Sequence, residues 1–234
     1  MNINFADTKQ TKVVIGIVVL FLILFLLSTN FIKPGFTSLG FIVSDLFVFT
    51  VSRLLYWVCL LWLWFYTTKI EGQKLLLWKE QPLNFTQYLK HVPTLYFSLI
   101  GGMVILGIIM QLTHQLKESQ ILFQLVKFIN GNVPVILLTC VTAAVVEEVI
   151  FRGYLLPRLT IMFKSEVWAI AVSSVLFGLL HYKYGTLVNI LGPIFIGAVF
   201  AYYYYHYRNI KVIIICHFLW DFLAMMLLSF KLHH

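Results

Sequence analysis

The sequence predicts an all-α fold, a polytopic transmembrane helix bundle with about seven spans and interfacial amphipathic helices. Of the 234 residues, 61% are hydrophobic and only 11% are charged, whereas a soluble domain usually has about 45–50% apolar and about 25% charged residues. The apolar residues gather in runs of the roughly 20 residues that a helix needs to cross a bilayer. The net charge of +8 comes from Lys and Arg in short loops between these runs, a pattern typical of membrane topology. We therefore expect a lipid bilayer around the protein and no nucleic-acid partner.

Three of the expected spans lie in the N-terminal half. Residues 13–32 and 41–66 form two apolar runs, and the polar, lysine-containing stretch 67–91 separates them from a third span at 92–112. Residues 113–130 are too polar to cross the membrane. Four apolar residues nevertheless recur there at helical spacing, which predicts an amphipathic helix at the membrane interface: Leu122, Leu125, Val126 and Ile129.

The C-terminal half contains the other four spans. They begin near residue 132 and continue at 166–181, 187–205 and 210–230. We expect residues 1–131 to supply membrane helices and interfacial segments, and residues 132–234 to form the core that carries the function. Both parts would belong to one integrated membrane domain.

The distribution of loop charges predicts the orientation. With the N terminus in the cytoplasm, eleven of the 17 Lys and Arg residues fall on the cytoplasmic side and five on the opposite side. This excess follows the positive-inside rule. The expected location is therefore a cell membrane, with several spans and a cytoplasmic N terminus.

A pair of adjacent glutamates, Glu147 and Glu148, ends an apolar run that has no charged residue from Val133 to Val146. A carboxylate at membrane depth costs at least a few kcal/mol, so it is by default a functional hypothesis. Arg152 lies four residues after Glu148, on the same face of a helix, and can pair with it. Glu147 lies about 100° around the helix, so it can point elsewhere and act as a base.

Two further pairs lie on later spans. Phe177 and His181 are four residues apart, as are His217 and Asp221, so each pair shares a helix face. Glu147 and His181 are each 17 residues from Lys164, in the turn between their spans, which is at most about 25 Å along a helix. The first two clusters are therefore expected at the same depth in the membrane. Four polar side chains that meet inside a membrane, Glu147, His181, His217 and Asp221, favour a shared function.

Several alternatives remain open from the residues alone. Glu148 and Arg152 would suffice as a structural ion pair, and an isolated His181 would suffice as a packed, hydrogen-bonded residue. Glu147, His181 and His217 could also bind catalytic zinc, although the sequence has no His-Glu-x-x-His helix. A proton relay or transporter also uses intramembrane Glu and His.

The three clusters together resemble a known family. Glu-Glu-x-x-x-Arg is matched by Glu147, Glu148 and Arg152, Phe-x-x-x-His by Phe177 and His181, and His-x-x-x-Asn/Asp by His217 and Asp221. In this order and spacing, the chain resembles the CPBP (Abi, CAAX protease-like) intramembrane proteases, relatives of the eukaryotic CAAX prenyl endopeptidase. The resemblance covers about residues 132–230.

The resemblance implies a glutamate-dependent endopeptidase with its site inside the membrane. Glu147 and His181 would activate water, and His217 with Asp221 would stabilise the oxyanion of the tetrahedral intermediate. Asp221 stands where the eukaryotic enzymes have Asn. An ionised aspartate cannot donate a hydrogen bond, so we expect Asp221 to orient His217 or to be protonated.

The same resemblance implies supporting roles for the other three residues. Glu148 and Arg152 would hold the site together, Phe177 would shape it, and no metal or other cofactor would be needed. The substrate would be a small peptide precursor or a membrane-anchored protein. Because the Lys-, Ile-, Phe- and Tyr-rich composition indicates a low-GC bacterium, we expect the bacterial cytoplasmic membrane. A non-catalytic membrane scaffold or bacteriocin-immunity protein of the same family is the alternative.

Overall fold

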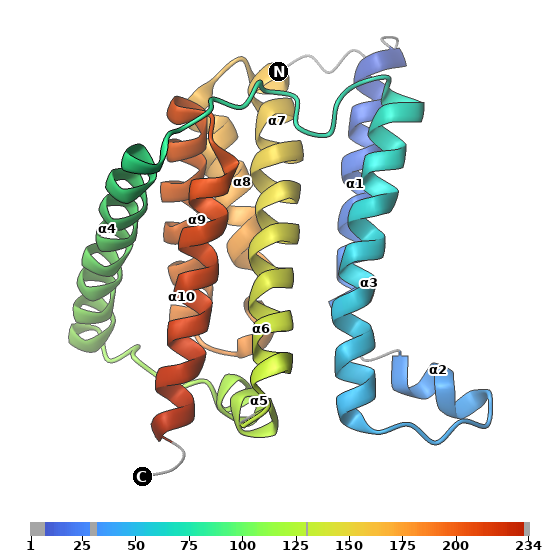
Figure 1. Cartoon of the computed structure of the whole chain (residues 1–234), viewed down its shortest axis with the longest axis vertical. Helices are drawn as coiled ribbons and strands as arrows, with labels where there is room; N and C mark the ends of the chain where they lie inside the picture. The colour runs from blue at the N-terminus through green and yellow to red at the C-terminus, as the bar shows by residue number, and fades with distance from the viewer. Residues whose placement is uncertain (1–7, 29–31, 130, 232–234) are drawn as a thin grey trace. The chain divides into compact units, whose positions relative to one another are not determined.

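The computed structural model describes residues 8–28, 32–129 and 131–231, and over these residues the regular secondary structure is entirely helical (Figure 1). Seven helical segments in the described part are long and apolar enough to cross a membrane. The prediction of an all-α membrane protein with about seven spans is therefore confirmed. The segments are Thr8–Leu27, Asp45–Glu71, Phe85–Leu112, Val133–Phe163, Glu166–Tyr184, Val188–Tyr207 and Ile210–Phe230.

The chain forms two compact units, residues 1–77 and residues 78–234. The predicted division at residue 131 concerns which part of the chain carries the function, and it remains a prediction. In the first unit, α1 (Thr8–Ser28) packs against α3 (Asp45–Phe65), which continues into the π-helical η1 (Tyr66–Glu71). The Tyr66 hydroxyl donates to the Lys12 carbonyl at 2.8 Å, which links the two long helices. The short α2 (Ile32–Ser38) lies between them in the chain.

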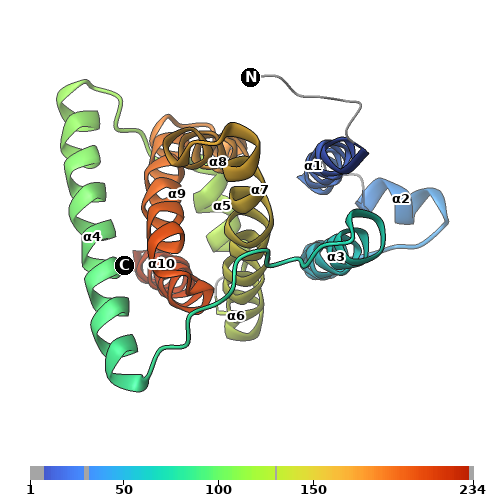
Figure 2. The same cartoon turned by 90° about the horizontal axis from the view of Figure 1, so that it is seen from above.

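The second unit begins with α4 (Phe85–Leu112), which starts seven residues earlier than predicted. Asn84 and Gln87 form a capping box, in which each side chain binds the other residue's backbone N–H. This satisfies N–H groups that a helix start otherwise leaves unpaired, so the helix extends through polar residues. Seen from above, α4 runs along the side formed by α9 (Val188–Tyr207) and α10 (Ile210–Lys231) (Figure 2).

The predicted amphipathic helix is present as α5 (Gln120–Ile129). Its Val126 and Ile129 are buried, whereas Ile121 and Phe128 are exposed. Ser119 caps its N terminus and also donates through Oγ to the Tyr184 carbonyl at 2.6 Å. This bond ties α5 to the turn that follows α8 (Glu166–Leu179).

The fourth span is the most enclosed element of the second unit. Half of the residues in its most apolar 18-residue stretch are buried inside the protein, a larger share than in any other span. It begins as α6 (Val133–Thr142) and ends as α7 (Leu156–Phe163). Between these lie two π-helical segments, η2 (Ala143–Glu147) and η3 (Val149–Leu155). A π-helical insertion inside an α-helix often marks a functional site, and here the two segments include Glu147 and flank Glu148.

Helices α8 and α9 pack closely at Gly178. A Cβ atom at this position would lie 2.7 Å from the Ile190 carbonyl oxygen, which is too close for a real contact. Glycine therefore allows the two backbones to approach. Helix α8 ends at Leu179, and the turn that follows it contains His181.

Candidate active site

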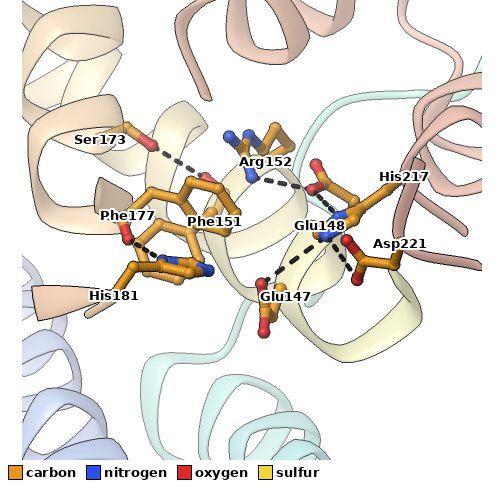
Figure 3. Close-up of polar contacts among 9 residues, drawn as sticks. All are labelled: Glu147, Glu148, Phe151, Arg152, Ser173, Phe177, His181, His217 and Asp221. Carbon is orange, nitrogen blue, oxygen red and sulfur yellow. Dashed lines mark hydrogen bonds and ion pairs between the residues drawn. The ribbon is translucent and has the colours of Figure 1, made fainter. Parts of the chain in front are cut away.

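The structure brings the three sequence clusters together in the second unit (Figure 3). Glu147, Glu148 and Arg152 come from the fourth span, and His217 and Asp221 from α10. Phe177, near the end of α8, joins them, because its ring lies 5.1 Å from the His181 ring and 6.1 Å from the His217 ring. All seven predicted site residues therefore lie in one region.

Glu148 is the most connected carboxylate in this region. It is completely buried, and its Oε1 atom lies 3.0 Å from Nη1 of Arg152 and 2.7 Å from Nδ1 of His217. The local pair with Arg152 was predicted from the spacing, but the contact with His217 was not. It joins residues 69 positions apart in the chain.

Arg152 is also completely buried. Its Nε and Nη2 atoms have no hydrogen-bond partner among the residues that the structure describes. Aromatic faces surround the cation instead, with the guanidinium carbon 4.4 Å from the Phe177 ring centre, 5.7 Å from Phe200 and 5.8 Å from Phe151. Rings at these distances attract a cation electrostatically, and the attraction is larger where water is excluded.

Gly197 of α9 makes room for this arrangement. A Cβ atom there would lie 3.0 Å from Nη2 of Arg152 and 3.2 Å from the Phe177 ring. Sequence reasoning missed Gly197, Phe151 and Phe200. A glycine within a bulky apolar helix was the available signal for Gly197, because glycine allows close approach of other groups to the backbone. The two phenylalanines gave no signal in a chain with 21 of them.

The second nitrogen of His217 faces two carboxylates. Nε2 lies 3.5 Å from Oδ2 of Asp221 and 4.0 Å from Oε2 of Glu147. The side chains of Glu147 and Asp221 are 29% and 27% exposed, whereas that of Glu148 is fully buried. The two adjacent glutamates are therefore not equivalent: Glu148 is held inside the protein, and Glu147 lies at an accessible edge.

His181 is held by its own helix. Its Nδ1 lies 2.9 Å from the Phe177 carbonyl oxygen. A carbonyl oxygen can only accept, so Nδ1 carries the proton, and in the neutral ring Nε2 keeps its lone pair. In Figure 3 this ring extends towards the side of the region where Glu147 lies. His181 can therefore offer an acceptor nitrogen to a bound group.

Among the residues that the structure describes, no group of three His, Cys, Asp or Glu side chains is arranged to hold a metal ion. The zinc set considered from the sequence was Glu147, His181 and His217. In the structure, Nε2 of His217 is 4.0 Å from the nearer Glu147 oxygen.

Residues 129–223 match a protein family that is described as type II CAAX prenyl endopeptidase Rce1-like. This part of the chain is similar to that family. The match confirms the resemblance predicted from the motifs, and it spans all seven site residues. Comparisons with curated proteins and with solved structures gave no match. The matched segment runs from the end of α5 into α10, and the seven candidate spans indicate a multi-pass membrane protein.

Proposed function

We propose that the protein is an intramembrane endopeptidase that hydrolyses a peptide bond with water activated by Glu147 and His181. The observation that supports this most is the difference between the glutamates. Glu148 is neutralised inside the protein, whereas Glu147 is partly exposed beside two imidazoles. Peptide hydrolysis needs a base for water, an acid for the leaving amine and a donor for the oxyanion. The side chains around Glu147 offer each of these.

In the proposed reaction, Glu147 takes a proton from a water molecule that His181 Nε2 helps to orient. The water oxygen bonds to the carbonyl carbon, and the carbonyl π electrons move to the oxygen. Nε2–H of His217 donates to that oxyanion. When the intermediate collapses, the C–N bond breaks and the proton held by Glu147 passes to the leaving amine.

Asp221 has a supporting part in this scheme. An ionised carboxylate only accepts hydrogen bonds, so Asp221 does not donate to the oxyanion. Its position 3.5 Å from Nε2 of His217 suits an orienting role.

We propose a small peptide precursor or a membrane-anchored protein as the substrate. The experiment uses purified protein in liposomes and internally quenched CAAX-type peptides, farnesylated and unmodified, with products identified by mass spectrometry. Loss of a general base costs about 10²–10⁴-fold, so we expect Glu147→Gln to lower kcat by about 10³-fold and His181→Ala by about 10²-fold. Glu166→Gln is the matched control, because Glu166 lies in a partly exposed pair with His206.

Three outcomes decide between the hypotheses. Wild-type rates in both Glu147→Gln and His181→Ala would contradict the proposal. Absence of cleavage by the wild type with either peptide would favour the non-catalytic scaffold or immunity protein, in which phenotype follows protein abundance. A parallel assay with a chelator tests zinc, and we expect unchanged activity.

We further propose that the protein lies in a bacterial cytoplasmic membrane with a cytoplasmic N terminus. The excess of Lys and Arg in the loops on that side supports this orientation. Labelling of single cysteines in loops with a membrane-impermeant reagent tests it. If a cysteine in the loop around Lys164 is labelled from outside intact cells, the N terminus lies on the opposite side of the membrane and the proposed orientation is wrong.

A further inference from the structure

One oxygen of Glu148 serves two partners. Oε1 lies 3.0 Å from Nη1 of Arg152 and 2.7 Å from Nδ1 of His217 (Figure 3). Both side chains of the Glu148–Arg152 pair are inaccessible to solvent, and the His217 side chain is only 7% exposed. A structural ion pair between neighbouring turns of one helix needs no contact with His217. The contact between Glu148 and His217 therefore links the fourth span to α10.

The contacts of this oxygen fix where the protons of His217 lie. Arg152 has only donors, so its N–H points at Oε1 and favours an ionised Glu148. A carboxylate oxygen can only accept, so Nδ1 of His217 donates its proton to Glu148. This leaves Nε2 as the nitrogen that faces the accessible edge of the site, towards Glu147 and Asp221.

Nε2 faces two carboxylate oxygens, and these are its nearest polar contacts among the residues that the structure describes. Its distances of 3.5 Å to Asp221 and 4.0 Å to Glu147 both exceed the roughly 2.7–2.9 Å of a charge-assisted hydrogen bond. A ring protonated on both nitrogens suits carboxylates on either side. Its Nε2–H can then donate to a group that enters between Asp221 and Glu147.

We propose that Glu148, fixed by Arg152, is a positioning residue that sets the orientation and proton arrangement of His217, so that Nε2–H is directed at the substrate carbonyl. This inference rests on the proposed peptidase function. It assigns Glu148 a role that the ion pair with Arg152 does not require. The aromatic rings around Arg152 then stabilise the cation, whose Nε and Nη2 groups have no hydrogen-bond partner in the described part of the chain.

The test compares two variants of Glu148 in the liposome assay with the internally quenched CAAX-type peptides. Glu148→Met has a similar length but no acceptor, whereas Glu148→Gln keeps an oxygen without the charge. Removal of one donor to an oxyanion costs about 10²–10³-fold, so we expect Glu148→Met to lower kcat by about 10²-fold or more. Glu148→Gln should lower kcat by about tenfold, and KM should change less than about threefold in both.

Arg158→Met is the control for a purely structural effect. Arg158 is also buried, and it packs over the Tyr154 ring at 4.0 Å and donates to the Tyr154 carbonyl. Its loss should reduce the amount of folded protein while leaving kcat per folded molecule unchanged. If Glu148→Met behaves in the same way, the positioning role is wrong. If Glu148→Met does not fold, Glu148→Gln decides, and an unchanged kcat overturns the inference.

The outcomes also separate this inference from the proposed function. Cleavage by the wild type that is lost in Glu147→Gln but retained in both Glu148 variants would support the peptidase and overturn the role of Glu148. Wild-type rates in Glu147→Gln and His181→Ala would overturn the peptidase mechanism itself, whatever the Glu148 variants do.

Discussion

Gly197→Ala tests how closely the site depends on packing between helices. The added Cβ would lie 3.0 Å from Nη2 of Arg152, whereas ordinary van der Waals contact begins at 3.4 Å. The guanidinium would therefore have to move by about 0.4 Å. Arg152 is 3.0 Å from the Glu148 oxygen that also contacts His217. The displacement would thus either weaken the ion pair or pass through Glu148 to His217.

The expected size of the effect follows from this displacement. A misplacement of 1 Å can cost about 10²-fold in rate, so a shift of about 0.4 Å suggests a five- to tenfold lower kcat. Overpacking typically costs about 1–3 kcal/mol, and alanine recovers about 1 kcal/mol of helix propensity over glycine. The net loss of stability is then about 0–2 kcal/mol.

Gly101→Ala provides the matched control. Gly101 lies within α4, and a Cβ there would meet no atom within 4 Å. The same substitution should leave kcat unchanged and stabilise the helix by up to about 1 kcal/mol. The assay measures kcat and KM in liposomes together with thermal unfolding. If both variants have the same kcat, the reasoning about packing against Arg152 is refuted.

Two further predictions concern the elements that support the site. Gly178→Ala should destabilise the second unit by about 1–3 kcal/mol, because its Cβ would lie 2.7 Å from the Ile190 carbonyl oxygen; an unchanged thermal unfolding midpoint would contradict this. Glu80→Gln should cost about 1–3 kcal/mol by leaving one donor unpaired, because the two Glu80 oxygens accept from the Tyr204 hydroxyl and from the N–H of Ile210, at the start of α10. Hydrogen exchange at the N terminus of α10 should increase in this variant, and unchanged protection there would show that the cap is dispensable.

Local sequence relationships predicted much of the site. The pair Glu148–Arg152 follows from a spacing of four residues, and the structure contains it. The 69-residue separation between Glu148 and His217 carries no such rule. That contact depends on the rotation and depth of α10 relative to the fourth span. Spacing within a helix therefore predicted which side chains share a face, but not which faces meet.

Some features of the fold also lay beyond the periodic pattern. The capping box at Asn84 extended α4 beyond its apolar run, since a polar cap can stabilise residues that hydropathy would leave outside a span. The π-helical backbone around Glu147 and Arg152 had no sequence signal, because its apolar residues are consistent with an ordinary helix. The aromatic surroundings of Arg152 came from three helical segments and could not be assigned from any one of them.

By itself, the sequence predicted the class of protein, about seven spans and the residues of a candidate site. Hydropathy predicts the class and the spans because a bilayer imposes a length and an apolar composition on every span. The motif spacings predict the site residues, because ionisable groups inside apolar spans are rare and usually functional. The spacing to Arg152 already separated the two glutamates, but only the tertiary structure showed that Glu148 is fully buried and also contacts His217. Both are carboxylates in one apolar helix, and the neighbouring helices bury Glu148 between Arg152 and His217 while leaving Glu147 at the accessible edge.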